Sequence, residues 1–190
     1  RQKFYGSEQI LSLEYKKAGT TVKLGDHSQS MSPLTLNGEQ GLGAGLEVDS
    51  EKWNVKASVQ RSRHVFPVQE RAGVSVTRTL TPTTKISSNL LHRNGLYRGT
   101  VLTTRAQARP LGPTSRLDIE CGVNSYRLIS DPSCTLLASQ STRTWSSRIR
   151  VQRGSESFPG VIAGMKQISE FASVRLSRQI RLDNNVRWMN

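Results

Sequence analysis

Seven basic side chains have the type and spacing to bind phosphate groups along a nucleic acid. The guanidinium fork of arginine donates to two phosphate oxygens at once, and lysine adds a mobile positive charge. Contacts of this kind supply affinity without reading the bases. We therefore expect a nucleic-acid interface formed by Lys23, Lys56, Arg61, Arg116, Arg148, Arg150 and Arg153.

Six of these cations recur in pairs because the chain repeats itself. Trp145, the Val-Gln-Arg run that ends at Arg153 and the later Phe-Pro pair each lie 92 residues after a counterpart in the first half. In this register Lys56 matches Arg148 and Arg61 matches Arg153, while Lys23 matches Arg116 with one residue of slippage. The repeat predicts two related units, at about residues 1–92 and 93–190, in one domain.

The overall composition also favours a polyanionic partner. Lysine and arginine total 27 against 14 acidic residues in 190, which gives a formal net charge of +13. Such a charge repels itself in a compact state unless a partner neutralises it. No stretch has the roughly 20 apolar residues of a membrane-spanning helix, so we expect a soluble protein without membrane contact. Cys121 and Cys134 lack metal-ligand spacing, and we expect reduced thiols rather than a disulfide.

Each unit is predicted to be four strands followed by a helix, an α+β fold. From Trp53 and from Trp145 onward, apolar and polar residues alternate with the period of a strand. Further strands are predicted at 9–16, 20–25, 41–48, 99–107, 114–121, 125–129 and 134–139. Turns at Asn37-Gly38 and at residues 130–132 should join neighbouring strands.

A helical stripe is predicted after each Phe-Pro pair. In the second unit Val161, Met165, Ile168 and Ala172 recur at spacings of three and four. In the first unit a similar stripe starts at residue 68, although the same residues also fit a strand. The helix should cover the apolar face of the sheet and leave the polar, basic face open. Trp53 and Trp145 share the apolar face, so we expect them in the core rather than stacked on bases.

Two units of four strands and a helix resemble the Whirly fold of single-strand-binding proteins. Residues 4–14 stand where that family has its first strand, and residues 36–40 stand where it has a turn into an apolar strand. The Trp53-Asn-Val-Lys56 strand and a closing helix at 158–171 are most similar to the guide-RNA-binding proteins of kinetoplastid mitochondria.

This resemblance implies a function and a location. It implies a mitochondrial matrix protein that forms a tetramer, of one kind of subunit or with a related one. Such a protein would bind single-stranded guide RNA by its phosphates and promote RNA–RNA annealing in editing or processing. An aromatic content of 6% agrees with backbone binding rather than base stacking.

Other readings of the same sequence stay open. A Whirly-type protein could bind single-stranded DNA in organelles, and an Arg-rich β protein could be a viral coat or matrix protein that packages RNA. An enzyme is not expected, because His27, His64 and His92 are scattered without a partner at a recognisable spacing. We expect no cofactor and no metal site.

Overall fold

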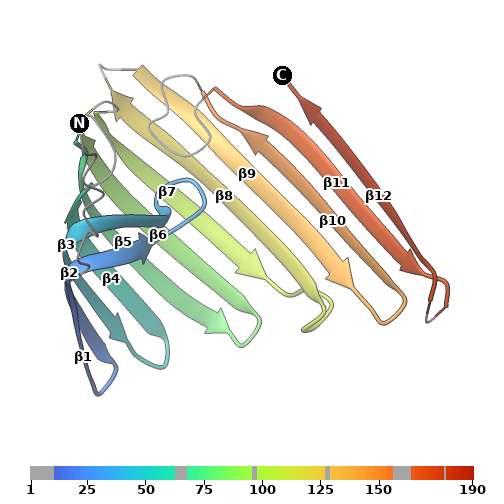
Figure 1. The fold of residues 1–190 in the computed structure, drawn as a ribbon, viewed down its shortest axis with the longest axis horizontal. Coiled ribbons are helices and arrows are strands. Elements are labelled where there is room, and N and C mark those ends of the chain that lie inside the picture. The colour runs from blue at the N-terminus through green and yellow to red at the C-terminus, as the bar shows by residue number, and fades with distance from the viewer. Residues whose placement is uncertain (1–10, 63–67, 96–97, 127–128, 156–163, 178) are drawn as a thin grey trace, which may run out of the picture.

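The protein is an all-β structure built from one antiparallel sheet. The computed structural model describes residues 11–62, 68–95, 98–126, 129–155, 164–177 and 179–190. Twelve strands follow one another in space in the order of the sequence, from β1 at one edge to β12 at the other (Figure 1). The described residues contain no helix, so the predicted α+β fold of two ββββα units is wrong.

Neighbouring strands are joined directly, and every pair is antiparallel. The strands are β1 (Ser12–Lys17), β2 (Thr20–Ser30), β3 (Asn37–Asp49), β4 (Trp53–Arg61), β5 (Glu70–Thr81), β6 (Thr84–Asn94), β7 (Gly99–Ala108), β8 (Ser115–Tyr126), β9 (Ile129–Ser141), β10 (Trp145–Arg153), β11 (Lys166–Arg175) and β12 (Arg181–Met189). We call the end of the sheet with the connections 18–19, 50–52, 82–83, 109–114, 142–144 and 176–180 the turn end, and the opposite end the loop end.

The two predicted helices are wrong because apolar residues four positions apart also lie on one face of a strand. Ala72, Val76 and Leu80 lie on β5, and since four is a multiple of two, all three point to one face of the sheet. The same holds for Ile168 and Ala172 on β11. The rest of the predicted second helix and its Phe-Pro start, residues 156–163, lie outside the described residues, as does the first Phe-Pro pair.

Several predicted strand boundaries are also wrong. Asn37 and Gly38 begin β3 instead of forming a turn, and Gly38 has a φ of 71°. Residues 130–132, predicted as a turn, are part of β9. In contrast, Ala18 and Gly19 join β1 to β2 with φ values of 46° and 78°. Positive φ at both central residues is what a two-residue hairpin turn requires, since it matches the twist of the strands.

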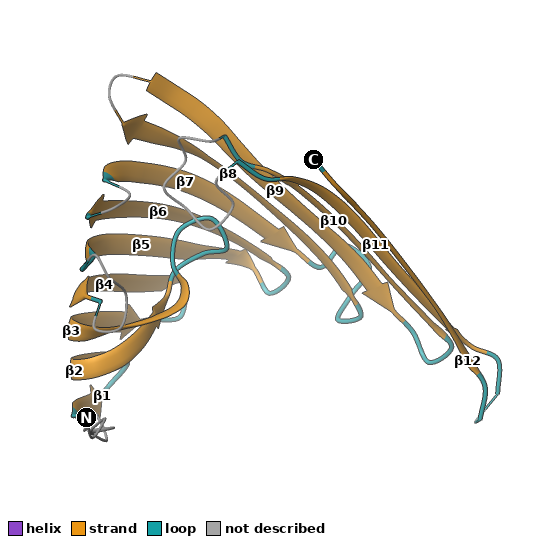
Figure 2. Ribbon diagram, turned by 45° about the horizontal axis from the view of Figure 1, so that its top comes forward, coloured by secondary structure: helices purple, strands orange, loops and turns teal. Residues whose placement is uncertain are grey.

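The two sequence repeats become two sets of six strands in one continuous sheet. β4 and β10, which carry the matching Trp segments, are each the fourth strand of a set. The sheet is open and strongly curved, and the connection between β2 and β3 folds over its inner side (Figure 2). We call the face toward this connection the inner face and the opposite face the outer face.

The burial of the two faces is the reverse of the expected one. In β4 the polar residues Ser58 and Gln60 are buried on the inner face, while Val55 and Val59 are exposed on the outer face. The cluster of buried apolar side chains is small and lies on the inner side. It consists of Leu34, Leu36, Leu91 and Val101, with Met31 and Met165 packed against it.

Candidate functional site

The outer face is a largely apolar surface. Residues directly opposite each other in neighbouring strands share a face, and Leu102 of β7 lies between Leu90 of β6 and Val123 of β8. The same pattern holds across the sheet. Exposed apolar side chains on this face are Leu42, Leu46, Val48, Val55, Val59, Val74, Leu80, Ile86, Leu90, Leu102, Ile119, Val123, Ile149, Ile168, Val174, Leu182 and Val186.

Three exposed aromatic side chains of this face lie at the turn end, on separate strands. Trp53 and Trp145 are the first residues of β4 and β10, and both are exposed. Tyr15 of β1 lies opposite the outer-face residue Val22 and is also exposed. The Arg78 guanidinium lies 5.2 Å from the centre of the Trp53 ring, a cation–π contact at the rim. The expectation that the two tryptophans lie in the core is therefore wrong.

Polar residues interrupt the outer face away from its ends: Ser88 of β6 and Thr104 of β7 are exposed opposite each other, and β11 adds a charged residue. Glu170 of β11 is exposed between Ile149 and Val186. Ser147 and Asn184 lie opposite the next outer-face residue of the same strand, Ala172. The charged interruption lies in β10–β12, whereas the outer-face positions of β3 from Leu42 to Val48 and of β4 from Trp53 to Val59 are apolar.

The inner face is polar and hydrogen-bonded. Asp118 of β8 accepts hydrogen bonds from Arg105 at 2.7 Å, from Gln107 at 3.1 Å and from Arg116 at 2.8 Å. Burial by itself would raise the pKa of Asp118, but these donors outweigh burial and hold the pKa below its usual value. The carboxyl is therefore ionised at neutral pH and organises three neighbouring side chains.

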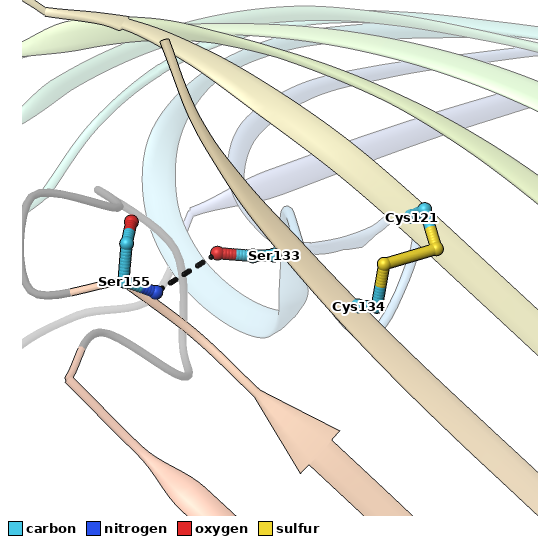
Figure 3. Close-up of a disulfide and its surroundings, with 4 residues drawn as sticks. All are labelled: Cys121, Ser133, Cys134 and Ser155. Carbon is cyan, nitrogen blue, oxygen red and sulfur yellow. Dashed lines mark hydrogen bonds between the residues drawn. A yellow bond between two sulfur atoms is a disulfide. The ribbon is translucent and has the colours of Figure 1, made fainter. Parts of the chain in front are cut away.

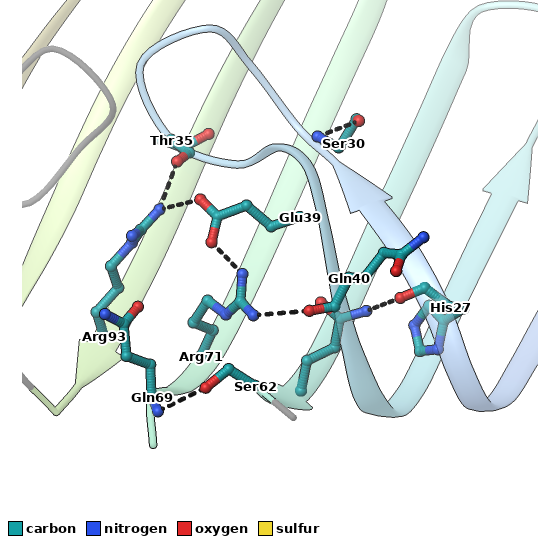
Figure 4. Close-up of polar contacts among 11 residues, drawn as sticks. His27, Ser30, Thr35, Glu39, Gln40, Ser62, Gln69, Arg71 and Arg93 are labelled. Atoms are coloured by element: carbon teal, nitrogen blue, oxygen red, sulfur yellow. Dashed lines mark hydrogen bonds and ion pairs between the residues drawn. The ribbon is translucent and has the colours of Figure 1, made fainter. Parts of the chain in front are cut away.

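Residues 31–36, which we call the strap, cross the inner face and are fixed there by polar contacts. Arg93 of β6 donates to the Thr35 carbonyl at 2.9 Å and to Glu39 at 2.7 Å. Glu39 also forms an ion pair with Arg71 of β5, whose second nitrogen donates to the Gln40 carbonyl at 3.1 Å (Figure 4). One half-buried carboxylate is thus the shared ion-pair partner of two buried guanidinium groups, and its single charge offsets only one of theirs.

Glu120 of β8 lies beneath the strap and is buried. Its carboxylate accepts a hydrogen bond from the Leu34 amide at 3.3 Å. Burial raises the pKa of Glu120 above its usual value, although contacts with Ser32, Thr103 and the Leu34 amide oppose the shift. The strap is therefore held at one side by an ion-pair cluster and at the other by an acid that burial keeps closer to its neutral form.

The seven predicted phosphate-binding residues are divided between the two faces. Lys23, Lys56, Arg116, Arg148 and Arg150 lie on the inner face, whereas Arg61 and Arg153 lie on the outer face at the loop end. Members of each repeated pair share a face.

Three of the five inner-face cations, Lys23, Lys56 and Arg116, lie close to an acidic residue. Lys56 forms an ion pair with Glu47 at 2.9 Å and Arg116 one with Asp118 at 2.8 Å. Burial opposes ionisation of Glu47, but hydrogen bonds from Asn54 and Lys56 lower its pKa, and the charge of Lys23 adds to the effect. Arg148 and Arg150 are exposed and have no ion pair among the residues that the structure describes.

The two cysteines form a disulfide rather than remaining free thiols. Cys121 of β8 and Cys134 of β9 are directly opposite each other, and their Cα atoms lie 4.2 Å apart (Figure 3). Both are exposed on the outer face. The 13-residue separation in sequence gave no sign that a hairpin would bring them together, because the turn had been expected inside β9.

The polar residues that hold the strap were not predicted from the sequence. Glu39, Arg71 and Arg93 belong to three strands, and Glu120 to a fourth. A signal was present, since Arg71 and Arg93 lie within β5 and β6, and a charge buried on a strand needs a partner. The partners become visible only once the connection between β2 and β3 is known to fold inward.

Comparisons with known proteins give no relative: no family model, curated protein or solved structure matches the chain. Within the described ranges there is no helix with the length and apolar character needed to cross a membrane.

Proposed function

We propose that the sheet sits in a lipid bilayer, with its outer face against the acyl chains and its inner face bordering an aqueous passage for polar solutes. The observation that carries this proposal is the inverted alternation of the strands, with apolar side chains exposed and polar side chains buried. A sheet in lipid has apolar residues at lipid-facing positions and polar residues between them. The proposal departs from the sequence-based expectation of no membrane contact.

Water is an unfavourable surrounding for the outer face. Full burial of a valine or leucine side chain stabilises a protein by about 1.5–3 kcal/mol relative to exposure. Leu90, Leu102 and Val123 adjoin one another and expose 47%, 51% and 45% of their surface. Contiguous apolar patches beyond a few hundred Å² mark contacts with protein or membrane. The face extends over all strands, which suits a bilayer better than a single protein partner.

The dimensions and the ends of the sheet also fit a bilayer. Strands β3 to β12 contain 9 to 13 residues, and a tilted strand needs about 9–11 residues to cross the hydrocarbon. Trp53, Trp145 and Tyr15 lie at the turn end and Trp188 at the loop end of this face, and aromatic rings favour the boundary between lipid and water. Glu170 is the costly exception and should lie where water or a polar partner reaches it.

In a bilayer both edge strands of the sheet need pairing partners. β1 and β12 each pair with one neighbour among the described strands. Unpaired backbone groups cost several kcal/mol each in hydrocarbon, so both edges must be paired in the membrane. Amide hydrogens of β1 and β12 should then exchange slowly in vesicles and quickly in their absence.

The inner face suits anionic solutes. Arg148, Arg150 and Arg175 are exposed on it and lack an ion pair among the described residues. Net positive charge along a passage raises the local concentration of anions. The Cys121–Cys134 bridge supports a location in an oxidising compartment, whereas the mitochondrial matrix stays a prediction from the resemblance.

The experiment that tests the proposal is the substitution Leu102→Arg, measured in phospholipid vesicles. An arginine at a central lipid-facing position costs about 2–4 kcal/mol, so the folding equilibrium in vesicles should fall roughly 30- to 700-fold. The matched control is Leu111→Arg, because Leu111 is also an exposed leucine but lies in the connection 109–114, outside the sheet. Equal effects of the two substitutions would show that lipid does not cover the outer face.

Binding of single-stranded RNA by its phosphates is a second candidate function. It is favoured by the common location of Lys23, Lys56, Arg116, Arg148 and Arg150 on the inner face. For this function Arg148→Ala should weaken binding of unrelated RNA sequences alike and reduce the salt slope by about 0.7 per lost contact. RNA binding that is insensitive to this substitution and to salt would exclude the candidate.

A further inference from the structure

An arginine-rich cleft opens at the turn end of β10–β12. It has a volume of about 380 Å³ and is bordered by residues 141–146 and by Ser173, Arg175 and Arg181. Its lining includes three arginines, Arg143, Arg175 and Arg181, and no acidic residue. The remaining lining consists of serine and threonine residues and Trp145.

Two of these arginines are placed in mutual repulsion. Arg175 of β11 is directly opposite Arg181 of β12, and like charges at such positions destabilise a sheet. Arg181 is partly neutralised, because its Nε donates to Asp183 at 2.8 Å and to Ser173 at 2.7 Å. Arg175 has no ion pair among the described residues, so positive charge in the cleft exceeds negative charge.

The backbone fixes the third arginine beside them. The Thr142 hydroxyl donates to the Trp145 carbonyl at 3.1 Å and accepts from the Trp145 amide at 3.1 Å. The Arg175 amide donates to the Thr144 carbonyl at 2.6 Å. These bonds hold the turn that carries Arg143 against the end of β11, which keeps the three cations at one site.

A cleft at the turn end does not need an excess of positive charge, as the opposite flank of the sheet shows. There a second cleft is lined by Lys16, Lys17 and Lys23, but also by Glu14, Glu47 and Asp49. Cations and acids are balanced in number at that flank, and Lys16 pairs with Glu14 at 2.6 Å. The β10–β12 cleft lacks this internal balance and leaves room for an anion.

We infer that the β10–β12 cleft is a binding site for a phosphate group. Guanidinium forks donate two parallel hydrogen bonds to phosphate oxygens, and neighbouring hydroxyls supply further donors. The group could come from free phosphate or from a lipid headgroup, since Trp145 beside the cleft lies on the apolar outer face. This inference does not rest on the membrane proposal, because either source presents the same oxygens.

The test is a titration of the full chain, in phosphate-free maltoside micelles, with inorganic phosphate against chloride at matched ionic strength. We expect phosphate to raise the unfolding temperature more than chloride does. Arg175→Gln should weaken phosphate binding roughly 10-fold or more, because a hydrogen bond to a charged group is lost. It should also raise the unfolding temperature without phosphate, since the repulsion with Arg181 is removed.

The matched control is Arg109→Gln, which removes an exposed arginine that also lies at the turn end but outside the cleft. It should leave phosphate binding unchanged. Equal stabilisation by phosphate and chloride, or equal losses in the two variants, would overturn the inference. A second arm replaces phosphate with a short-chain phosphatidic acid: tighter binding of the lipid than of phosphate assigns the headgroup, and equal binding assigns the free ion. Failure of both ligands to bind refutes the site without bearing on bilayer insertion.

Discussion

Removal of the Glu39 charge is expected to loosen the strap and to destabilise the protein strongly. Glu39 forms ion pairs with both Arg71 and Arg93, whose side chains are only 3% and 8% exposed. In Glu39→Gln two buried guanidinium groups would lose their common counter-charge, while Arg93 keeps the Thr35 carbonyl and Arg71 keeps the Gln40 carbonyl.

The expected loss in the free energy of unfolding is about 3–5 kcal/mol, the range found when one member of a buried ion pair is removed. This is a large part of the roughly 5–15 kcal/mol that stabilises a typical domain. Urea titration in maltoside micelles, followed by circular dichroism, measures it. The matched control is Glu47→Gln, because the Glu47–Lys56 pair is about one-third exposed on each side, and such a pair contributes at most about 1 kcal/mol.

We also expect a rescue by a second substitution and an effect on conductance. In Glu39→Gln with Arg93→Met, one of the two unpaired charges is gone, so part of the lost stability should return. If the inner face borders a passage, a loosened strap should increase anion conductance across a planar bilayer. A loss below about 1 kcal/mol in Glu39→Gln, equal to that of the control, would refute the view that this carboxylate fixes the strap.

Two further predictions concern acids of the inner face. The folded pKa of Asp118 is lowered, so its contribution to stability is present above its unfolded pKa of about 4 and is lost as pH falls through the folded value. Asp118→Asn should therefore reduce stability at pH 7 and weaken the fall of the urea midpoint between pH 7 and pH 3. An unchanged fall of the midpoint would contradict this. The folded pKa of Glu120 is raised, so ionisation of Glu120 above its unfolded pKa opposes folding. Glu120→Gln should therefore be more stable than the native chain at pH 8 but not at pH 4. A loss of stability at both pH values would show that the carboxylate is needed in its charged form.

The sequence allowed the strand faces to be predicted better than the architecture. The alternation from Trp53 and from Trp145 correctly gave β4 and β10 and put Lys56 and Arg148 on the polar face. It could not separate a strand from a helix where apolar residues recur every four positions, as in β5. Nor did it indicate that β8 extends to Tyr126 and that β9 begins at Ile129, which brings Cys121 opposite Cys134.

The amino-acid sequence by itself determined which side chains share a face, because successive residues of any strand point to opposite sides. Only the tertiary structure decided which face is enclosed. Burial depends on the curvature of the sheet and on the inward path of residues 31–36, which bring Leu34 over Glu120 and Thr35 to Arg93. Those contacts join residues 86 and 58 positions apart, and no local pattern encodes them.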